Sequence, residues 1–535
     1  TISWRALILD PELLETAGVA EPASILRLGE NLESWMRGVK ELTLQNLFER
    51  ILKEGGILQE ILQSTEKIWL LQVLTSFFEF IKSEMVKQPT LDLDEFLEML
   101  RKMDSHGIPL QLVRVVHSEE GVQFMTAHGA KGLEFGYVFV IGCSSNAWEG
   151  KQVAGWNQFR MPEGVHRADT DRNLEDERRL FYVAMTRAKK ALFLSYHLED
   201  ERGSHLQKSQ FLSELEASSS LPDRLEQVVT ERVETYYTRL LLPEARPFQL
   251  LDHDWIDHQL QGLALSSTSL NKFLRCPLTF YFEQILRVPT ARTDRMGFGK
   301  AVHYALEKFH SHFQDNSTVE ALIYHFREGM ENHQSHFTKK QFEEQIFYGE
   351  QILPAYYQAR IASWRLLKEK PRVEYRITEA AYAGVPISGI IDKIEQHDHG
   401  IRVIDYKTGK FAANKLNPPP DDLDPGSEYW RQIVFYKLLL DQIPEYRHRM
   451  QDGIMDFIIP DNQGKFEFRT ISVRPEDEAS VGRALNHVYE KIKAHAFYPG
   501  CGKEDCYWCA LVNHHFDVQH VESLQLEREE IEEQD

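Results

Sequence analysis

The stretch PISGIIDKIEQHDHGIRVIDYKTGK, Pro386–Lys410, decides how the C-terminal half of this chain is interpreted. Two runs rich in apolar residues flank residues 397–400, and a four-residue turn of this kind is a common hairpin connection. We expect the runs to pair as antiparallel strands, with Gln396 opposite Ile401. This register is an assumption, so a surface hairpin with solvated charges remains the alternative.

The same register, continued outward, places Asp392 opposite Asp405. Like charges at opposed positions destabilise a sheet unless something compensates them. Lys407 lies two residues beyond Asp405 and therefore shares its face. A divalent cation would relieve the repulsion, and hard oxygen ligands favour Mg²⁺, with Mn²⁺ as a substitute. Such a metal can generate hydroxide and stabilise a transferring phosphoryl group.

GIIDKIE followed by VIDYKTG resembles the signature of PD-(D/E)XK nucleases, in the form seen in RecB-type and AddB-type enzymes. The resemblance implies that Asp392, Asp405 and Lys407 are the catalytic set and that Asp392 and Asp405 bind metal. It also implies an α/β restriction-endonuclease-like fold, which we expect over residues 263–535. Ile391 stands where the family name has Pro, a departure shared by these branches.

Two more segments match the same family in the same order. GFGKAVHYALEKFH, Gly297–His310, resembles its upstream helix, which implies that His303 is a metal ligand. WRQIVFYKLLL, Trp430–Leu440, carries the family's Gln-x-x-x-Tyr element on Gln432 and Tyr436. Spacing of four puts both on one helix face, where they could reach the catalytic site or the DNA backbone. Taken alone, His303 could be structural and the other two ordinary helix residues.

Three of the chain's five cysteines lie in CGKEDCYWC, residues 501–509. AddB-type nucleases hold a [4Fe-4S] cluster with one cysteine ahead of the nuclease core and three after it. That layout falls here on Cys276, Cys501, Cys506 and Cys509. Zinc is the alternative, because thiolate sets suit both, and His495, His514 or His515 could then replace Cys276. Cys143, after an apolar run, is interpreted as a buried structural thiol.

The first half of the chain resembles UvrD-type superfamily 1 helicases. VQFMTAHGAKGLEFGYVFV, Val122–Val140, is similar to their motif V, and DERRLFYVAMTRAKKAL, Asp176–Leu192, is similar to their motif VI. The resemblance implies contacts to single-stranded DNA from Thr126 and His128, nucleotide contacts from Gly132 and Glu134, and an arginine finger at Arg187.

These motifs predict a partial motor. We expect a helical subdomain over residues 1–120, a RecA-like second motor lobe over 121–215 with parallel strands covered on both faces, and a linker over 216–262. VQFMTAH, YVFVIG and ALFLSYH are the expected strands. The sequence contains no G-x-x-x-x-G-K-[ST] phosphate loop. ATP use would therefore need a missing N-terminal helicase lobe or a partner helicase subunit, and the chain, which begins with Thr1, is expected to be part of a longer protein.

Composition sets limits on this interpretation. The formal net charge of −21 in 535 residues is unlike that of a typical nucleic-acid binder, but a basic groove can coexist with acidic outer faces. An odd, small number of cysteines and no long apolar run predict a cytoplasmic protein without a membrane span. We expect a Mg²⁺-dependent DNA nuclease attached to a helicase that processes DNA ends in recombination repair. A non-catalytic DNA-binding or scaffold subunit is the alternative, and an RNA-directed nuclease would not carry motifs V and VI.

Overall fold

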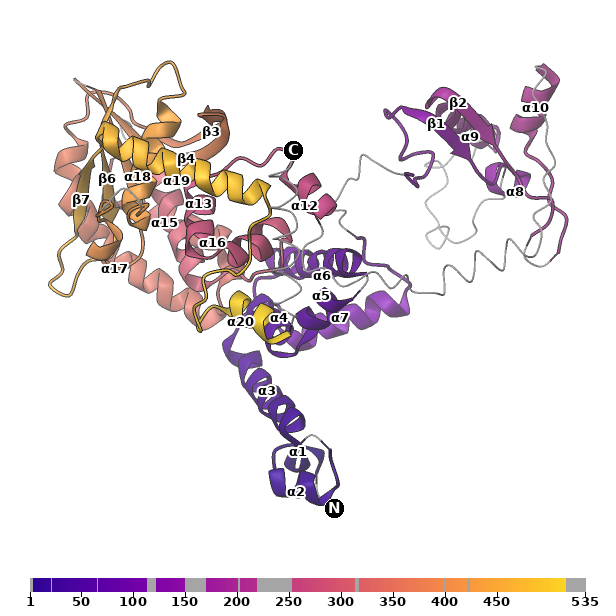
Figure 1. Ribbon diagram of the computed structural model, residues 1–535, viewed down its shortest axis with the longest axis horizontal. Helices are drawn as coiled ribbons and strands as arrows, with labels where there is room; N and C mark the ends of the chain where they lie inside the picture. The colour runs from indigo at the N-terminus through magenta and orange to yellow at the C-terminus, as the bar shows by residue number, and fades with distance from the viewer. Residues whose placement is uncertain are drawn as a thin grey trace, which may run out of the picture. The chain divides into compact units, whose positions relative to one another are not determined.

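The computed structural model describes residues 3–20, 22–64, 66–112, 122–149, 170–200, 203–218, 253–312, 317–398, 400–420 and 424–515 (Figure 1). The chain divides into two compact units. One combines Thr1–His117 with Ala245–Asp535, and the other is Ser118–Glu244. No helix among the described residues is long and apolar enough to cross a membrane.

The N-terminal segment is helical, as its apolar spacing predicts. Side chains cap several of the helices: Thr43 accepts a hydrogen bond from the main chain of Asn46, and Asp92 and Glu95 form a capping box. The helices are α1 (Trp4–Leu7), α2 (Pro11–Thr16), α3 (Pro22–Glu41), α4 (Leu44–Glu54), α5 (Ile57–Gln63), α6 (Lys67–Lys87) and α7 (Leu93–Ser105).

A five-stranded sheet is the centre of the larger unit. Its strands are β3 (Arg372–Tyr382), β4 (Val385–His397), β5 (Gly400–Lys407), β6 (Met450–Phe457) and β7 (Phe468–Ser472), in that spatial order. β5 and β6 are parallel, and the other neighbours are antiparallel. The predicted hairpin is therefore present as β4 and β5, and the α/β class is confirmed.

The predicted hairpin register is confirmed, but the turn is shorter than expected. Gln396 pairs with Ile401, and His397 also pairs with Gly400, so each strand continues one residue closer to the tip. Gly400 has φ +155°, and a Cβ there would lie 2.3 Å from the carbonyl oxygen of Arg449. Only glycine allows the backbone of β5 to approach the main chain of Arg449, the residue that precedes β6, this closely.

Helices cover both faces of the sheet. α13, α18 and α19 share one hydrophobic core with it, and α15, α16 and α17 share another (Figure 1). The helices of this part are α12 (His253–Leu260), α13 (Ser267–Arg275), α14 (Pro277–Phe280), the π-helix η1 (Tyr281–Ile285), α15 (Asp294–Ser311), α16 (Val319–Asn332), the 3₁₀ turn η2 (Gln334–His336), α17 (Lys339–Trp364), the 3₁₀ turn η3 (Ala413–Lys415), α18 (Glu428–Leu440), α19 (Pro475–Lys493) and α20 (Tyr507–His515).

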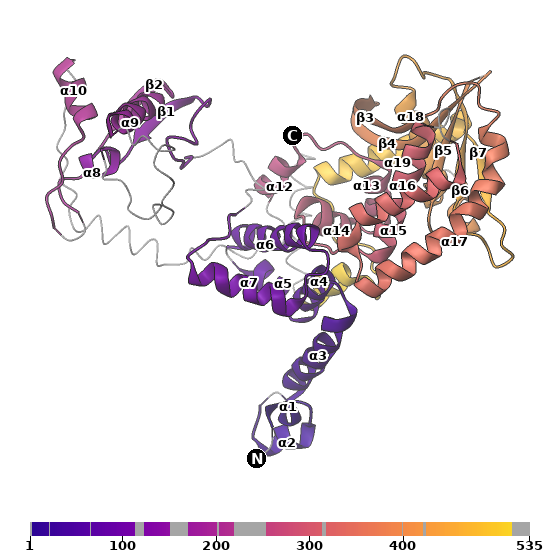
Figure 2. The same ribbon diagram turned by 180° about the vertical axis from the view of Figure 1, so that it is seen from behind.

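The N-terminal helices pack into the same core as the sheet. Five leucines from α4, α5 and α6 belong to the cluster that contains the α18 and α20 side chains, namely Leu52, Leu58, Leu62, Leu71 and Leu74. Lys53 of α4 lies over the ring of Tyr507 in α20, 5.2 Å from its centroid, and the two helices are side by side in both ribbon views (Figure 2). The helical region and the sheet thus form one folding unit.

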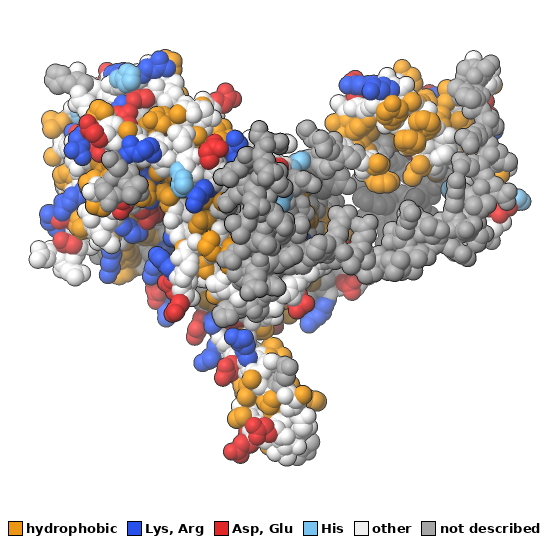
Figure 3. Space-filling view, viewed as in Figure 1, with side chains coloured by type: hydrophobic (Ala, Val, Ile, Leu, Met, Phe, Trp, Pro, Cys, Tyr) orange, Lys and Arg blue, Asp and Glu red, His pale blue; other side chains and the backbone are white. Residues whose placement is uncertain are grey.

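The smaller unit contains two parallel strands, β1 (Phe135–Val140) and β2 (Ala188–Leu194), with α8 (Ser145–Trp148), α9 (Thr170–Met185) and α10 (Gln210–Ser218). The strand predicted over Val122–His128 is absent. Thr126 instead accepts hydrogen bonds from Gly129 and Ala130 and starts a turn. The expectation of a sheet covered on both faces is wrong for the described residues, because the stacked rings of Phe139 and Phe193 are 65% and 48% exposed. Figure 3 shows hydrophobic side chains at the surface of this unit.

Candidate active site and cysteine cluster

An open cleft of about 670 Å³ lies where β3, β4 and β5 meet α13, α15 and α18. His303, Asp392, Asp405, Lys407, Gln432 and Tyr436 all line it. The structure therefore brings every residue predicted for the nuclease site into one cavity. Hydroxyl groups and Arg376 occupy much of the remaining wall.

Asp405 is the most enclosed member of the site, with 2% of its surface exposed. Its Oδ1 accepts hydrogen bonds of 2.8 Å from Gln432 Nε2 and from the hydroxyl of Tyr436. Its Oδ2 lies 2.8 Å from Nζ of Lys407, which also donates to Oε1 of Gln432 over 2.8 Å. Gln432 and Tyr436 thus hold the carboxylate of Asp405 from one turn of α18, and both line the cleft.

Asp392 is held from the other side of the cleft. The main-chain N–H of Tyr406 donates to its Oδ2 over 2.9 Å, and Nδ1 of His303 lies 3.5 Å from the same oxygen. Nε2 of His303 lies 3.1 Å from the carbonyl oxygen of Tyr406. The backbone of Tyr406, which lies between Asp405 and Lys407, therefore contacts both Asp392 and His303.

Glu374 belongs to this group and was missed from the sequence. Its Oε1 lies 3.9 Å from Nδ1 of His303, and ligand atoms of His303, Glu374 and Asp392 lie within 4.8 Å of one another. The backbone of Glu374 has φ +46°, a conformation that non-glycine residues rarely adopt and that is often found at functional sites. Its neighbours Val373 and Tyr375 pair with Lys393 and Ile391, so counting across β3 and β4 could have found it.

The electrostatics of the site reflect crowded carboxylates. Burial and then the charge of Asp405 raise the pKa of Asp392 to about 7. Burial alone would lower the pKa of His303, but Asp392, Glu374 and Asp405 outweigh it and raise the pKa to about 9. Burial also opposes the charge of Lys407, yet Asp405 keeps its pKa above the usual value. Lys407 therefore stays cationic beside a carboxylate.

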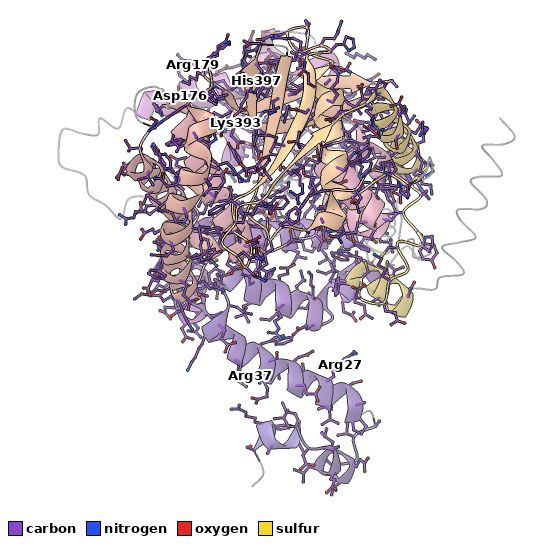
Figure 4. All side chains as sticks on the ribbon, turned by 90° about the vertical axis from the view of Figure 1, so that its left-hand side faces the viewer. Arg27, Arg37, Asp176, Arg179, Lys393 and His397 are labelled. Atoms are coloured by element: carbon purple, nitrogen blue, oxygen red, sulfur yellow. The ribbon has the colours of Figure 1, made fainter. Side chains whose placement is uncertain are left out.

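A second polar network lies behind the site. The hydroxyl of Tyr406 lies 3.1 Å from Nε2 of His310, seven residues after His303 in α15. Nearby on β4, Lys393 is fully buried, and Nζ pairs with Glu395 over 2.7 Å, while His397 lies 3.4 Å from the same carboxylate (Figure 4). This network fixes the strands against α15 and α17 and leaves the cleft face free.

The donor set fits a divalent cation. The imidazole of His303 and the carboxylates of Glu374 and Asp392 bring ligand atoms within 4.8 Å of one another. Asp405 lines the same cleft, with Oδ2 paired to Lys407. Oxygen-rich sets of this type suit Mg²⁺ or Mn²⁺, so His303, Glu374 and Asp392 could hold such a cation, with Asp405 beside them.

The four predicted cluster cysteines also lie together. Their sulfur atoms are within 4.8 Å of one another, with Cys276 Sγ 3.6 Å from Cys509 Sγ and 3.7 Å from Cys506 Sγ. Cys501 Sγ lies 3.7 Å from Cys509 Sγ. Because Cys276 and Cys509 are 233 positions apart in sequence, the group joins the two ends of the sheet-containing fold.

The alternative in which a histidine replaces Cys276 is wrong for His495. Its ring contacts His253 and Asp257 instead, with Nε2 2.7 Å from the Asp257 carboxylate. The side chains of His514 and His515 lie outside the described residues. Cys143 is fully buried, as predicted, and burial raises the pKa of its thiol.

The predicted motor residues gather at one end of the β1–β2 pair. Nη1 of Arg187 donates to the carbonyl of Leu133 over 3.0 Å, and the carbonyl of Arg187 accepts from the N–H of Phe135 over 2.8 Å. Glu134 pairs with Lys189 over 2.9 Å, and Gly132 has φ +86°. Exposed Thr126 and His128 stand on the preceding turn.

Comparison with known proteins agrees with this geometry. Residues 264–513 match the PD-(D/E)XK nuclease superfamily, and residues 27–199 match the UvrD-like helicase C-terminal domain. DNA helicase II of Haemophilus influenzae is 30% identical over 241 residues, which cover 42% of this chain and 29% of that protein. ATP-dependent DNA helicase PcrA of Staphylococcus aureus is 23% identical over 250 residues, or 43% and 30% of the two chains.

The cleft and its carboxylates therefore lie in the segment that matches the PD-(D/E)XK nuclease superfamily. The chain combines this segment with one that matches a UvrD-like helicase C-terminal domain, which confirms both resemblances. The matched segments span less than a third of the length of the two curated helicases named above.

Proposed function

We propose that this chain is the DNA nuclease part of a helicase–nuclease that processes DNA ends in recombination repair. The supporting observation is the convergence of Asp405, Lys407, Asp392 and His303 in one open cleft. A buried carboxylate beside a retained lysine cation is suited to hydrolysis of a phosphodiester. The helicase-related segment supports DNA as the substrate.

Each residue of the site has a proposed role. His303, Glu374, Asp392 and Asp405 would hold Mg²⁺ or Mn²⁺, which supplies an activated water and neutralises charge on the reacting phosphate. Lys407 orients the attacking water or the phosphate as a fixed cation, because its raised pKa keeps it protonated. Gln432 and Tyr436 hold Asp405 in place, and the tyrosine hydroxyl also accepts from the glutamine amide.

The remaining sites support the same proposal. Cys276, Cys501, Cys506 and Cys509 would carry a [4Fe-4S] cluster that serves structure. Thr126 and His128 would contact single-stranded DNA. Gly132, Glu134 and Arg187 would contact ATP once a first motor lobe or a partner subunit supplies the phosphate loop.

Cleavage of single- and double-stranded DNA with Mg²⁺ tests the function directly. We expect cleavage by the purified chain and none by Asp405→Asn or Lys407→Ala. Lys491→Ala, which changes an exposed lysine of α19, is the control and should cleave like wild type. Wild-type rates in Asp405→Asn would refute the site. DNA binding without cleavage by the wild-type chain would favour a non-catalytic scaffold subunit instead.

A further inference from the structure

A group of cations gathers where the N-terminal helices meet the nuclease domain. Arg292 precedes α15, Lys300 lies within α15, and Lys82 belongs to α6. His333 precedes η2, and His336 is its last residue. The segments are held together by specific contacts rather than by charge. Gln45 of α4 accepts from the main-chain N–H of Arg292 over 3.2 Å and donates to the carbonyl of Ser335 over 2.9 Å.

These cations act on one another. Burial, followed by the charges of Arg292 and Lys82, lowers the pKa of Lys300. Burial, Arg292, His333, Lys300 and Lys82 lower the pKa of His336 to about 3. His336 is therefore neutral, and its Nε2, 3.4 Å from Nη1 of Arg292, can accept from the guanidinium and orient it without neutralising it.

Compensating carboxylates are scarce at this junction. Lys82 pairs with Glu79 over 2.7 Å. Across the described parts of the chain, no carboxylate forms an ion pair with Arg292 or Lys300. Arg292 and Lys300, which have no carboxylate partner among the described residues, are unexpected in a chain of net charge −21, in which acidic side chains outnumber basic ones by 82 to 61. Like charges held close together favour binding of an anion.

The group adjoins the catalytic cleft. Lys300 precedes His303 by three residues in α15, and residues at this spacing share a helix face. A Cβ at Gly299 would lie 2.9 Å from Oγ1 of Thr408, which lines the cleft. An extended anion in contact with Lys300 can therefore continue to the metal ligand His303.

We propose that Arg292 and Lys300 form a phosphate-binding patch that holds the sugar–phosphate backbone of a DNA strand beside the nuclease cleft. Gln45 of the helicase-related α4 holds the main chain at Arg292, so the patch depends on both parts of the chain. The patch would bind phosphates without regard to base sequence, because its contributing groups are cations on long side chains. The inference rests on the proposed action on DNA.

The salt dependence of DNA binding tests the patch. Fluorescence anisotropy would follow a labelled oligothymidylate bound to the full chain in EDTA, so that no cleavage occurs. Each lost phosphate contact should reduce the slope of log affinity against log salt by about 0.7 for a single strand. We expect that reduction for Arg292→Gln and for Lys300→Gln, and about twice as much for the double variant, because each phosphate contact contributes separately.

Lys308→Gln is the matched control. Lys308 lies in the same helix but pairs with Glu307 over 3.2 Å, so its charge is already compensated, and its substitution should leave the slope unchanged. The fold should survive in the test variants, because Gln45 contacts Arg292 through the main chain only. Equal thermal midpoints of the variants would verify this.

The results separate this inference from the proposed function. Wild-type slopes in Arg292→Gln and Lys300→Gln would overturn the patch, even if Asp405→Asn abolishes cleavage and the function stands. Reduced slopes in a chain that never cleaves DNA would support the patch and refute the nuclease activity.

Discussion

At the scale of single residues, Tyr406 connects the two halves of the candidate active site. Its backbone contacts Asp392 and His303, and its hydroxyl reaches His310 in the same helix as His303. We expect Tyr406→Phe to reduce the free energy of unfolding by about 1 kcal/mol, since one buried hydrogen bond is lost. Because α15 then loses an anchor, the Mg²⁺ concentration for half-maximal cleavage should also rise.

Urea unfolding and a Mg²⁺ titration measure the two effects. Tyr357→Phe is the control, because its hydroxyl donates to the carbonyl of Ser317 over 2.6 Å and does not contact the site. The control should lose similar stability with an unchanged Mg²⁺ midpoint. An unchanged midpoint in Tyr406→Phe would leave the tyrosine a purely structural role.

Protons and metal should compete at Asp392 and His303. A ligand carboxyl must be ionised and a ligand imidazole neutral, and the pKa values here are raised to about 7 and about 9. Metal affinity should therefore increase between about pH 6 and pH 9, with release of protons on binding. Calorimetric titration with Mn²⁺ in buffers of different ionisation enthalpy would count those protons. A pH-independent affinity would exclude these two residues as ligands.

Residue identities were the most predictable feature of the site. The hairpin pattern places Asp392, Asp405 and Lys407 close together, because strand alternation converts sequence spacing into spatial neighbours, and the family resemblance singled them out as the site. Glu374 was missed because a lone glutamate in a strand looks like an ordinary exposed residue. Its place beside His303 becomes apparent only once the pairing of β3 with β4 is known.

At the scale of elements, the cysteines join α13 and α14 to α20. A bridge between residues 233 positions apart restricts the unfolded chain, by about 5 kcal/mol in the loop-closure treatment of disulfides. We expect Cys276→Ala to lose its iron and to expose the nuclease domain to proteolysis. Cys143→Ala, which removes a buried thiol outside the group, should do neither.

Iron analysis and absorbance of protein purified without air would check this. About four irons per chain and broad absorbance near 400 nm are expected for Cys₄ ligation. Zinc in place of iron would exclude the [4Fe-4S] assignment while leaving the structural link. A Cys276→Ala protein with full iron content would contradict both.

Strands could be predicted where an apolar sequence pattern coincides with a neighbouring strand to pair with. β4 and β5 each lie between two neighbouring strands of the sheet. Val122–His128 also has an apolar pattern, but it has no neighbouring strand among the described residues. The cation junction could not be predicted at all. It combines α6, α15 and η2, and no single segment is unusually basic.

At the scale of the whole molecule, ATP turnover should be absent from this chain alone. The sequence lacks a phosphate loop, and Arg187 can act only on a nucleotide that another lobe holds. Purified protein should show no DNA-stimulated ATPase in a coupled assay. Substantial turnover that disappears in Arg187→Ala would show that the chain contains a complete motor.

The boundaries of the sequence matches and the boundaries of the compact units do not coincide in this chain. The helicase-related segment runs from residue 27 to 199, yet its first part folds with the nuclease and only residues beyond 117 form a separate body. The motor-like body is thus an insert with two attachment points, and a single proteolytic cut would not release it. A nuclease excised from residue 263 onward would lack α4 to α6 and uncover apolar surface that Leu52, Leu58 and Leu71 now cover. Laboratories that wish to shorten this protein should delete the insert and keep both ends.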